Sequence, residues 1–302
     1  MPSHGPVGDF PLDDKIVVIT GGGSGIGLAL AQACYTRNAK VLIGDLQLRP
    51  EAEKFVQANK DRVFFTKCDV TKWTDLNALI DKSIELFRDV PDVYCPVAGI
   101  FEPKWSNLWD DAEDEQGYYK TIRINTEHPI RLTRIAIRAL LGANKKGVVA
   151  LVASGAGLGG IYLSPLYCAS KHAIVGLAKS LGLADPQEGV KVVCICPGLV
   201  HTPLVTDRND GKGNMIGFHG EGHKDTRPHL KPEDIADGMV RLIMKGRYGG
   251  GTVMTKRAAA MGEMESGEVV VHERGERDYV TDGTFVQDLL AKERGVPWRA
   301  KK

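Results

Sequence analysis

The 302-residue chain contains no apolar run long enough to span a membrane. It begins MPSHGPVGDFPLDD, which has neither the basic nor the apolar segment of a secretory signal. Charge of one sign is not in excess, since 39 basic and 38 acidic residues leave a formal net charge of +1 at pH 7. Such a balance provides no field that favours nucleic acid or an anionic membrane surface. We therefore expect a cytoplasmic protein that acts on a small molecule, with no nucleic-acid or membrane partner.

Cysteine pairs with the C-x-x-C spacing are also missing. Cys194 and Cys196 fall on one face of a predicted strand, where parallel side chains make a poor disulfide. The sequence therefore predicts buried thiols in a reducing compartment. The six cysteines are Cys34, Cys68, Cys95, Cys168, Cys194 and Cys196.

Short apolar segments alternate with helical patterns along the chain. The alternation predicts βαβ units and hence a single α/β domain, a Rossmann-like doubly wound parallel sheet of about seven strands with helices on both faces. With 43% hydrophobic residues, the chain can bury one large core without a second domain. The strand-like segments lie near residues 15–20, 40–45, 62–67, 92–95, 147–153, 190–196 and 251–255.

The sheet pattern divides the chain into an N-terminal tail (1–13), a main domain (14–257) and a C-terminal extension (258–302). Within the main domain, residues 199–230 are polar and rich in glycine, and a loop of this length is typical of either a lid or a disordered insert. Residues 252–257 are expected to finish the sheet. The extension could wrap a neighbouring subunit, close the cleft or remain solvated.

A glycine-rich loop follows the first predicted strand. The strand Lys15–Thr20 ends at the loop Gly21–Gly27, and a helical pattern begins at Leu28. Glycine permits the positive φ angles and the close backbone approach that a diphosphate needs, and the free N–H groups of the new helix favour phosphate. A strand before the loop and a helix after it are the context expected of dinucleotide binding. The loop residues expected to bind the cofactor are Gly21, Ser24, Gly25, Ile26 and Gly27.

An acidic residue ends the second predicted strand. Asp45 lies about twenty residues past the loop, where a carboxylate can accept both ribose hydroxyls of NAD. A 2′-phosphate would face this carboxylate, and neither the glycine loop nor the following Leu46 offers a positive charge to offset the repulsion. We therefore predict NAD rather than NADP as the cofactor, the alternative for Asp45 being a solvated carboxylate.

Tyr167 and Lys171 are four residues apart in a predicted helix, which places them on the same face. A cation within several ångströms favours the phenolate and lowers the pKa of a tyrosine from its usual value near 10. By itself the pair is more typical of an amphipathic helix with an exposed lysine. Its place after a glycine loop and a strand-terminal acid favours acid–base chemistry instead.

In this order, the glycine loop, Asp45 and the Tyr167–Lys171 pair resemble the short-chain dehydrogenase/reductase family over roughly residues 14–255. The loop pattern of the family, T-G-x-x-x-G-x-G, appears at Thr20–Gly27. Together with matches at Ser154, at Asn125, at Asp69 and at Pro197-Gly198 with Thr202, the loop and the Tyr167–Lys171 pair make six matches in the family order, and coincidence is remote. The resemblance also favours a lid over the substrate for residues 199–230.

The other site residues of the family match positions at the ends of predicted strands and on the helix before residues 147–153. The resemblance implies Ser154 and Asn125 as further catalytic residues. Asp45 and the run Cys68–Thr71 are also similar to 15-hydroxyprostaglandin dehydrogenase-like members. The resemblance implies cofactor contacts at Asp45, Leu46, Asp69, Val70, Ala98, Gly99, Tyr167, Lys171, Pro197, Val200 and Thr202.

The chain departs from the family after the fourth predicted strand. Where the family reads N-N-A-G, this chain reads Pro96-Val97-Ala98-Gly99. The Ala-Gly that lets the backbone pass close to the cofactor ribose is kept, whereas both amide side chains are absent. Because Pro96 cannot donate a ladder hydrogen bond, we expect altered hydrogen bonding at this strand end.

The resemblance implies an NAD-dependent oxidoreductase that interconverts a secondary alcohol and a ketone. Tyr167 would be the general acid/base, Lys171 would favour its phenolate and bind the nicotinamide ribose, and Ser154 would hold the reacting oxygen. Asn125 would hold a water that relays protons. Two alternatives remain open, namely a redox-neutral enzyme on the same frame, such as an epimerase, dehydratase or cyclase, and a non-catalytic NAD-binding protein.

Three expectations concern residues outside these motifs. The helical stretches 112–141 and 165–185 often form the dimer interface in the family, which implies a homodimer or homotetramer. The segment His219–His223 has metal-ligand residue types, but its two glycines provide no rigid frame, so we expect no metal. Candidates for an apolar substrate wall, or alternatively for core packing, are Trp105, Trp109, Ile161, Tyr162 and Leu204.

Overall fold

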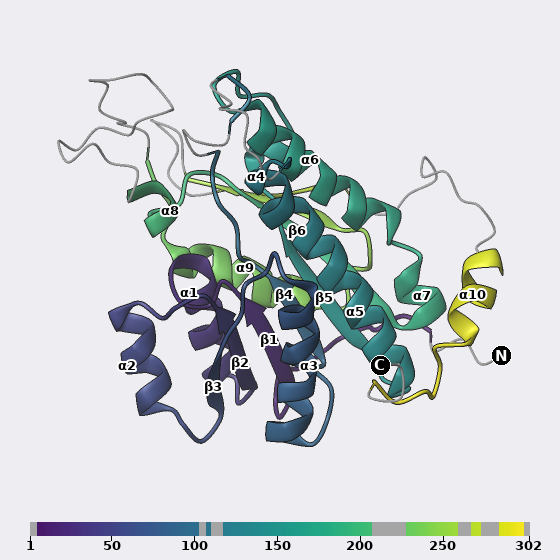
Figure 1. Ribbon diagram of the computed structural model, residues 1–302. Helices are drawn as coiled ribbons and strands as arrows, with labels where there is room; N and C mark the ends of the chain where they lie inside the picture. Colours follow the sequence, from purple (N-terminus) through teal and green to yellow (C-terminus); the bar gives the residue numbers. More distant parts are fainter. Residues whose placement is uncertain are drawn as a thin grey trace.

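The computed structural model describes residues 5–102, 107–109, 117–206, 228–258, 267–272 and 284–298. The strands within these residues are β1 (Ile16–Thr20), β2 (Lys40–Asp45), β3 (Val63–Lys67), β4 (Val93–Pro96), β5 (Gly147–Val152), β6 (Val190–Pro197), β7 (Val253–Arg257) and β8 (Gly267–His272). They form one sheet in the order β3-β2-β1-β4-β5-β6-β7-β8 (Figure 1). The first seven strands are parallel, which confirms the predicted fold class.

The central strands β1, β4 and β5 are buried throughout and almost entirely apolar, because both faces of the sheet are covered there. Along β1, Val17 and Ile19 enter one hydrophobic core, while Val18 between them enters the other. The helices on the first face are α1 (Gly25–Tyr35) and α9 (Pro232–Met244), and those on the second are α3 (Trp73–Phe87), α5 (His128–Gly142) and α6 (Pro165–Ser180) (Figure 1). Shorter helices are α2 (Pro50–Ala58), α4 (Lys120–Ile122), α7 (Ala184–Glu188), α8 (Pro203–Thr206) and α10 (Thr284–Ala291).

The expectation that residues 252–257 finish the sheet was wrong. The strand β8 pairs antiparallel with β7, in a register that places Thr255 opposite Val269. The run Gly267–His272 contains three consecutive valines, a composition typical of a strand. Without β8, the backbone groups along one side of β7 would lack ladder partners, and an unpaired edge invites pairing with another chain. Part of the C-terminal extension therefore belongs to the sheet.

The two predicted long helices are shorter than expected. Residues 117–119 are not helical, helix begins at Lys120, and residues 112–116 lie outside the described part of the chain. The second helix, α6, ends at Ser180, and a turn separates it from α7.

A single π-helical turn, Arg123–Glu127, connects α4 to α5. Pro129 has no N–H and cannot donate to the carbonyl of Asn125, the bond that a regular α-helix would make there. The N–H of His128 instead reaches five residues back to the Arg123 carbonyl. Asn125 thus lies in a wide turn, a feature that is frequent at functional sites.

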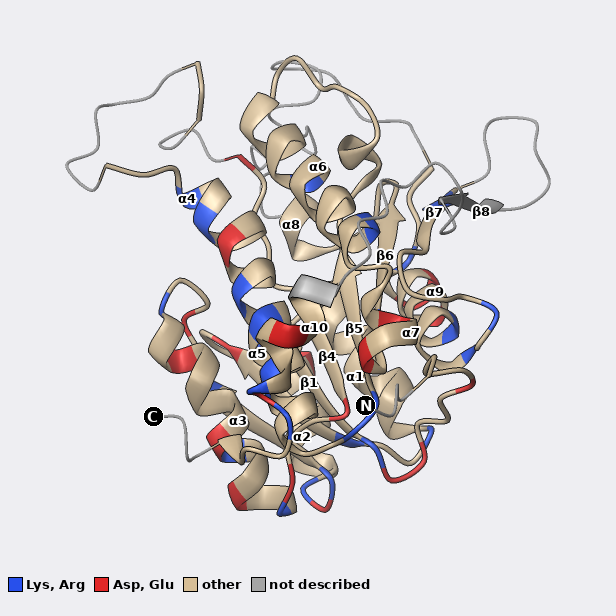
Figure 2. Ribbon diagram, turned by 90° about the vertical axis from the view of Figure 1, so that its right-hand side faces the viewer, with Lys and Arg blue, Asp and Glu red and all other residues tan. Residues whose placement is uncertain are grey.

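Both ends of the described chain pack on the main body. Phe10 is buried, and its N–H donates to the Met244 carbonyl at 2.8 Å. At the other end, the carboxylate of Glu293 pairs with Arg134 at 3.0 Å and with Arg138 at 3.4 Å, both on α5. Figure 2 shows the basic residues spaced along α5. The domain boundaries at residues 13 and 257 stay predictions.

The buried position of Lys191 predicts how the stability of the protein depends on pH. The residue is buried, its ammonium donates to the Ile243 carbonyl at 2.8 Å, and burial lowers its pKa to about 8. The unfolded chain holds this proton up to a pH of about 10.5, so the unfolded state binds more protons between these values and the free energy of unfolding rises with pH there.

The variant Lys191→Met lacks this titration. Across pH 8 to about 10.5, we expect wild type to gain about 1–3 kcal/mol in its free energy of unfolding relative to Lys191→Met. Urea unfolding of both proteins at the two pH values measures the difference, in which the titration of all other groups cancels. A difference that does not change with pH would contradict the assignment.

Candidate functional site

A cavity of about 950 Å³ lies at the carboxyl ends of the central strands. The topology explains its position, because the chain winds outward from β1 in one direction and from β4 in the other, and ligands of such sheets bind where the winding reverses. Every residue expected from the sequence to be catalytic or to bind cofactor lines the cavity, with the exception of Asn125. These lining residues are Gly21, Ser24, Gly25, Ile26, Gly27, Asp45, Leu46, Asp69, Val70, Ala98, Gly99, Ser154, Tyr167, Lys171, Pro197, Val200 and Thr202.

The glycine loop is packed so closely that Gly21 and Gly27 leave no room for a side chain. Gly21 has a φ of 71°, and a Cβ there would lie 2.6 Å from the backbone of Ala98. A Cβ on Gly27 would lie 2.1 Å from the carbonyl oxygen of Gly21. The helix α1 begins directly at Gly25, so its free N–H groups open toward the loop. The loop is therefore a cradle of backbone donors of the kind that holds a diphosphate.

The carboxylate of Asp45 closes the far side of this cradle. One oxygen accepts from the Gly23 N–H at 2.8 Å and the other from the Leu46 N–H at 2.7 Å. Both bonds fix the orientation of the carboxylate at the cavity wall. Each oxygen retains a lone pair for a further donor, such as a ribose hydroxyl.

Asp69 lies at the same end of the cavity. Partial burial disfavours its charged form, but hydrogen bonds from Thr71, at 2.7 Å from the hydroxyl and 3.0 Å from the N–H, together with the charge of Lys72, lower the pKa of the carboxyl. Asp69 therefore stays ionised and fixed in place. Its N–H donates to the carboxylate of Asp75 on α3, which orders the turn beside Val70.

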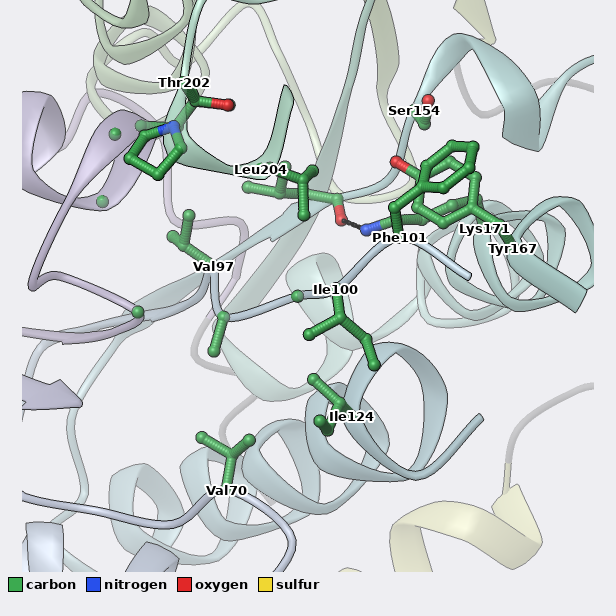
Figure 3. Close-up of a pocket in the computed structure, with 18 of the residues that line it drawn as sticks. Val70, Val97, Ile100, Phe101, Ile124, Ser154, Tyr167, Lys171, Thr202 and Leu204 are labelled. Atoms are coloured by element: carbon green, nitrogen blue, oxygen red, sulfur yellow. Dashed lines mark hydrogen bonds between the residues drawn. The ribbon is translucent and has the colours of Figure 1, made fainter. Parts of the chain in front are cut away.

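Ser154, Tyr167 and Lys171 gather at the opposite end of the cavity (Figure 3). Ser154 lies two residues after the end of β5, and its hydroxyl accepts from the Ala156 N–H at 3.2 Å. The Lys171 Nζ lies 5.6 Å from the centre of the Tyr167 ring and donates to the Val152 carbonyl at 3.1 Å. Burial lowers the pKa of Lys171 to about 8, so at pH 7 the group remains mostly an ammonium. A phenol and a buried cation thus lie at one end of the same cavity.

Asn125 lies behind the cavity wall and is held by three hydrogen bonds. Its Oδ1 accepts from the Ile100 N–H at 2.9 Å, and its Nδ2 donates to the Ile100 carbonyl at 2.8 Å and to the Ser170 hydroxyl at 3.2 Å. A Cβ on Gly99 would lie 3.3 Å from the Asn125 oxygen. The amide therefore fixes the backbone that follows β4 against α6.

Pro96 changes the hydrogen bonds at the end of β4. The N–H of the following residue, Val97, donates to the Thr20 carbonyl at 3.2 Å. Pairing between β4 and β5 is confined to Val93 and Tyr94, so β4 separates from β5 before its end. The backbone of Ala98 still passes against Gly21, which shows that the close approach survives the loss of both amide side chains.

Two of the five candidates for an apolar wall line the cavity, namely Ile161 and Leu204. Trp109 and Tyr162 do not line it, but stack on each other with ring centres 4.9 Å apart. Trp105, the segment His219–His223 and most of the predicted lid lie outside the described residues. No group of metal-ligating side chains occurs in the described part of the chain.

The structure adds lining residues that motif reasoning missed. Phe101 lies against the Tyr167 ring, with centres 4.6 Å apart, and Ile100, Ile124 and Leu199 add further apolar surface. The sequence contained a signal for Ile100 and Phe101. Residues directly after Gly99 leave the carboxyl end of a central strand and must border the same cleft.

The arrangement corresponds to a known family. A family model described as short chain dehydrogenase matches residues 15–213, and the chain belongs to this family. It is accordingly an oxidoreductase with a fold that binds a nicotinamide cofactor.

None of the described helices is long and apolar enough to cross a membrane.

Three relatives give the degree of similarity. The chain is 29% identical to 15-hydroxyprostaglandin dehydrogenase [NAD(+)] of Bos taurus, over 77% of this chain and 87% of the relative. It is 30% identical to the short chain dehydrogenase adrF of Penicillium roqueforti, over 77% and 91%. It is 25% identical to the short-chain dehydrogenase/reductase olcF of Penicillium canescens, over 76% and 90%.

Proposed function

We propose that the protein is an NAD-dependent dehydrogenase that interconverts a secondary alcohol and a ketone, with Tyr167 as the general acid/base. The observation that carries the proposal is the placement of Ser154, Tyr167 and Lys171 at one end of a single cavity whose other end is the glycine cradle and Asp45. An alcohol held by Ser154 would thus lie within the same space as the cofactor. Formation of NADH from NAD⁺ and an alcohol tests the proposal.

The cavity fits a nicotinamide dinucleotide on the evidence of its own groups. The amides of the glycine loop and of the first turn of α1 would hold the diphosphate, Asp45 the adenosine ribose, and Lys171 the nicotinamide ribose. When bound, the cofactor supplies the hydride acceptor at the nicotinamide C4.

Three side chains would act together in the proton transfer, of which Tyr167 takes the proton. Tyr167, as phenolate, takes the hydroxyl proton of the alcohol while the carbinol carbon loses its hydride, so that the products are a ketone, the phenol and NADH. The ammonium of Lys171 favours the phenolate because it places a positive charge near the ring. The Ser154 hydroxyl donates to the reacting oxygen and orients it toward Tyr167. Asn125 acts by fixing the backbone of Ile100 and would hold a relay water through its position near Lys171.

The substrate is expected to be small and largely apolar. Phe101 and Ile161 pack beside Tyr167 at the cavity wall, Leu204 also lines the cavity, and these side chains offer shape but no hydrogen bonds. Several relatives, including 15-hydroxyprostaglandin dehydrogenase [NAD(+)], carry names that fit such a substrate and this cofactor.

The orientation of Asp45 predicts the cofactor preference. We expect NADH to bind at least about tenfold more tightly than NADPH, because a 2′-phosphate would face a carboxylate that Gly23 and Leu46 hold in place. In Asp45→Ser the ratio should approach one. Fluorescence titration of both cofactors against both proteins measures the ratio of the two dissociation constants. The control is Asp237→Ser, which removes an exposed acid from α9. Tighter binding of NADPH than of NADH by wild type would contradict the assignment.

A further inference from the structure

The segment that follows Gly99 contacts Asn125 and Tyr167 through three successive residues. Ile100 is bonded through its backbone to Asn125. Phe101 lies against the ring of Tyr167, with centres 4.6 Å apart and planes inclined by 36°. Glu102 is buried, with 6% of its surface exposed, and its Oε2 accepts from the Tyr167 N–H at 3.1 Å. The third contact is made by a charged group that the proposed mechanism does not use.

The contact of Glu102 compensates for a missing cap. The first turn of any α-helix has N–H groups without partners in the helix, and a side chain at the N-cap position usually accepts from one of them. In α6 the N-cap residue is Ser164, whose side chain makes no capping bond. The carboxylate of Glu102, which is 65 positions away in the sequence, occupies that role for the Tyr167 N–H. A carboxylate at this end of the helix is also stabilised by the positive end of the helix dipole.

The same carboxylate also holds the backbone of residues 107–109. Its Oε1 accepts from the Leu108 N–H at 3.0 Å. The neighbouring Trp109 donates from its indole to the Tyr162 carbonyl at 3.1 Å, just before α6. Residues 107–109 are thus connected to the start of α6 twice, once through Glu102 and once through Trp109.

We propose that Glu102 is a positioning residue for Tyr167: it holds the first turn of α6, and with it the phenol, in the place that proton transfer requires. The inference rests on the proposed function, because it assigns Tyr167 the acid–base role. A general base must lie within hydrogen-bond reach of the proton that it removes, and small displacements of a reacting group lower the rate steeply. The cofactor cradle lies on other elements, so the loss of Glu102 should leave it intact.

The variants Glu102→Ala and Glu102→Gln separate positioning from general destabilisation. In Glu102→Ala we expect kcat to fall by about 10- to 100-fold, with KM for the alcohol and Kd for NADH within about twofold of wild type. Glutamine has the same shape as glutamate but keeps only one carbonyl acceptor for the N–H groups of Tyr167 and Leu108. The kcat of Glu102→Gln should therefore lie between those of wild type and Glu102→Ala. The control Glu233→Gln removes an exposed acid from the first turn of α9 and should leave all three constants unchanged.

A measurement without substrate tests whether Glu102 holds the Tyr167 N–H. Amide hydrogen exchange, followed in the NADH complex, should be faster at Tyr167 and Leu108 in Glu102→Ala than in wild type, while the amides of α1 stay unchanged. Wild-type kcat in Glu102→Ala, or unchanged exchange at Tyr167, would overturn the proposal. A lowered melting temperature with unchanged kcat would also overturn it, since it would leave only a structural role. If wild type oxidises no alcohol, the proposed function fails, whereas exchange at Tyr167 still decides whether Glu102 holds that amide.

Discussion

Tyr167→Phe is expected to lower kcat by about 10³-fold while the Kd for NADH stays within about twofold of wild type. The substitution removes only the phenol oxygen. The ring remains against Phe101, and the glycine loop, Asp45 and Lys171 are untouched. The fold and the cofactor cradle should therefore persist while the group that takes the proton is absent.

Tyr35→Phe is the matched control, because it removes the same atom from a tyrosine of α1 whose ring packs on Phe55 and Arg62, away from the cavity. Initial rates with both cofactor and alcohol varied give kcat and KM, and fluorescence titration gives the Kd for NADH. Turnover near the wild-type rate in Tyr167→Phe would mean that another group transfers the proton, and the proposed mechanism would have to be abandoned.

Gly27→Ala is expected to lower the free energy of unfolding by about 2–4 kcal/mol and to weaken NADH binding by at least about tenfold. The added Cβ would lie 2.1 Å from the Gly21 carbonyl oxygen and 2.9 Å from the Cα of Gly22. These are backbone atoms, which cannot rotate away as a side chain can. The start of α1 must therefore move from the glycine loop, and the N–H groups that hold the diphosphate must move with it.

Gly176→Ala makes the same chemical change at a position in α6 where a Cβ meets nothing within 4 Å. Alanine is the better helix former, so this variant should be as stable as wild type or more stable by up to about 1 kcal/mol. Chemical unfolding and NADH titration of the two variants provide the comparison. Equal stability and equal NADH affinity for Gly27→Ala and wild type would show that the loop is not packed as described.

The sequence was most informative where local chemistry determines the structure. The central parallel strands are short apolar runs, since both of their faces are buried, and such runs can be identified without a partner. The glycine loop requires glycine for local reasons, since Gly21 has a positive φ and a Cβ on Gly27 would meet the carbonyl of Gly21 in the same loop. The spacing of Tyr167 and Lys171 fixes their shared face through helix geometry alone.

Features that depend on contacts between distant segments were not predicted. The strand β8 exists because β7 offers a free edge, and nothing in the run Gly267–His272 specifies that neighbour. Glu102 reads as an ordinary surface acid, and only the fold brings it to the N–H of Tyr167. The π-helical turn at Arg123–Glu127 had a local signal in Pro129, which removes one helical donor, but the signal does not by itself define where Asn125 points.

The most direct test of the account is NADH formation by the purified protein, supplied with NAD⁺ and a panel of secondary alcohols that includes steroids, prostanoids, polyketides and simple sugars. The account predicts that at least one apolar alcohol yields NADH and its ketone in equal amounts, and that Tyr167→Phe yields neither. A product that appears while the bound cofactor stays unchanged would contradict the account, because it would identify a redox-neutral enzyme on the same frame.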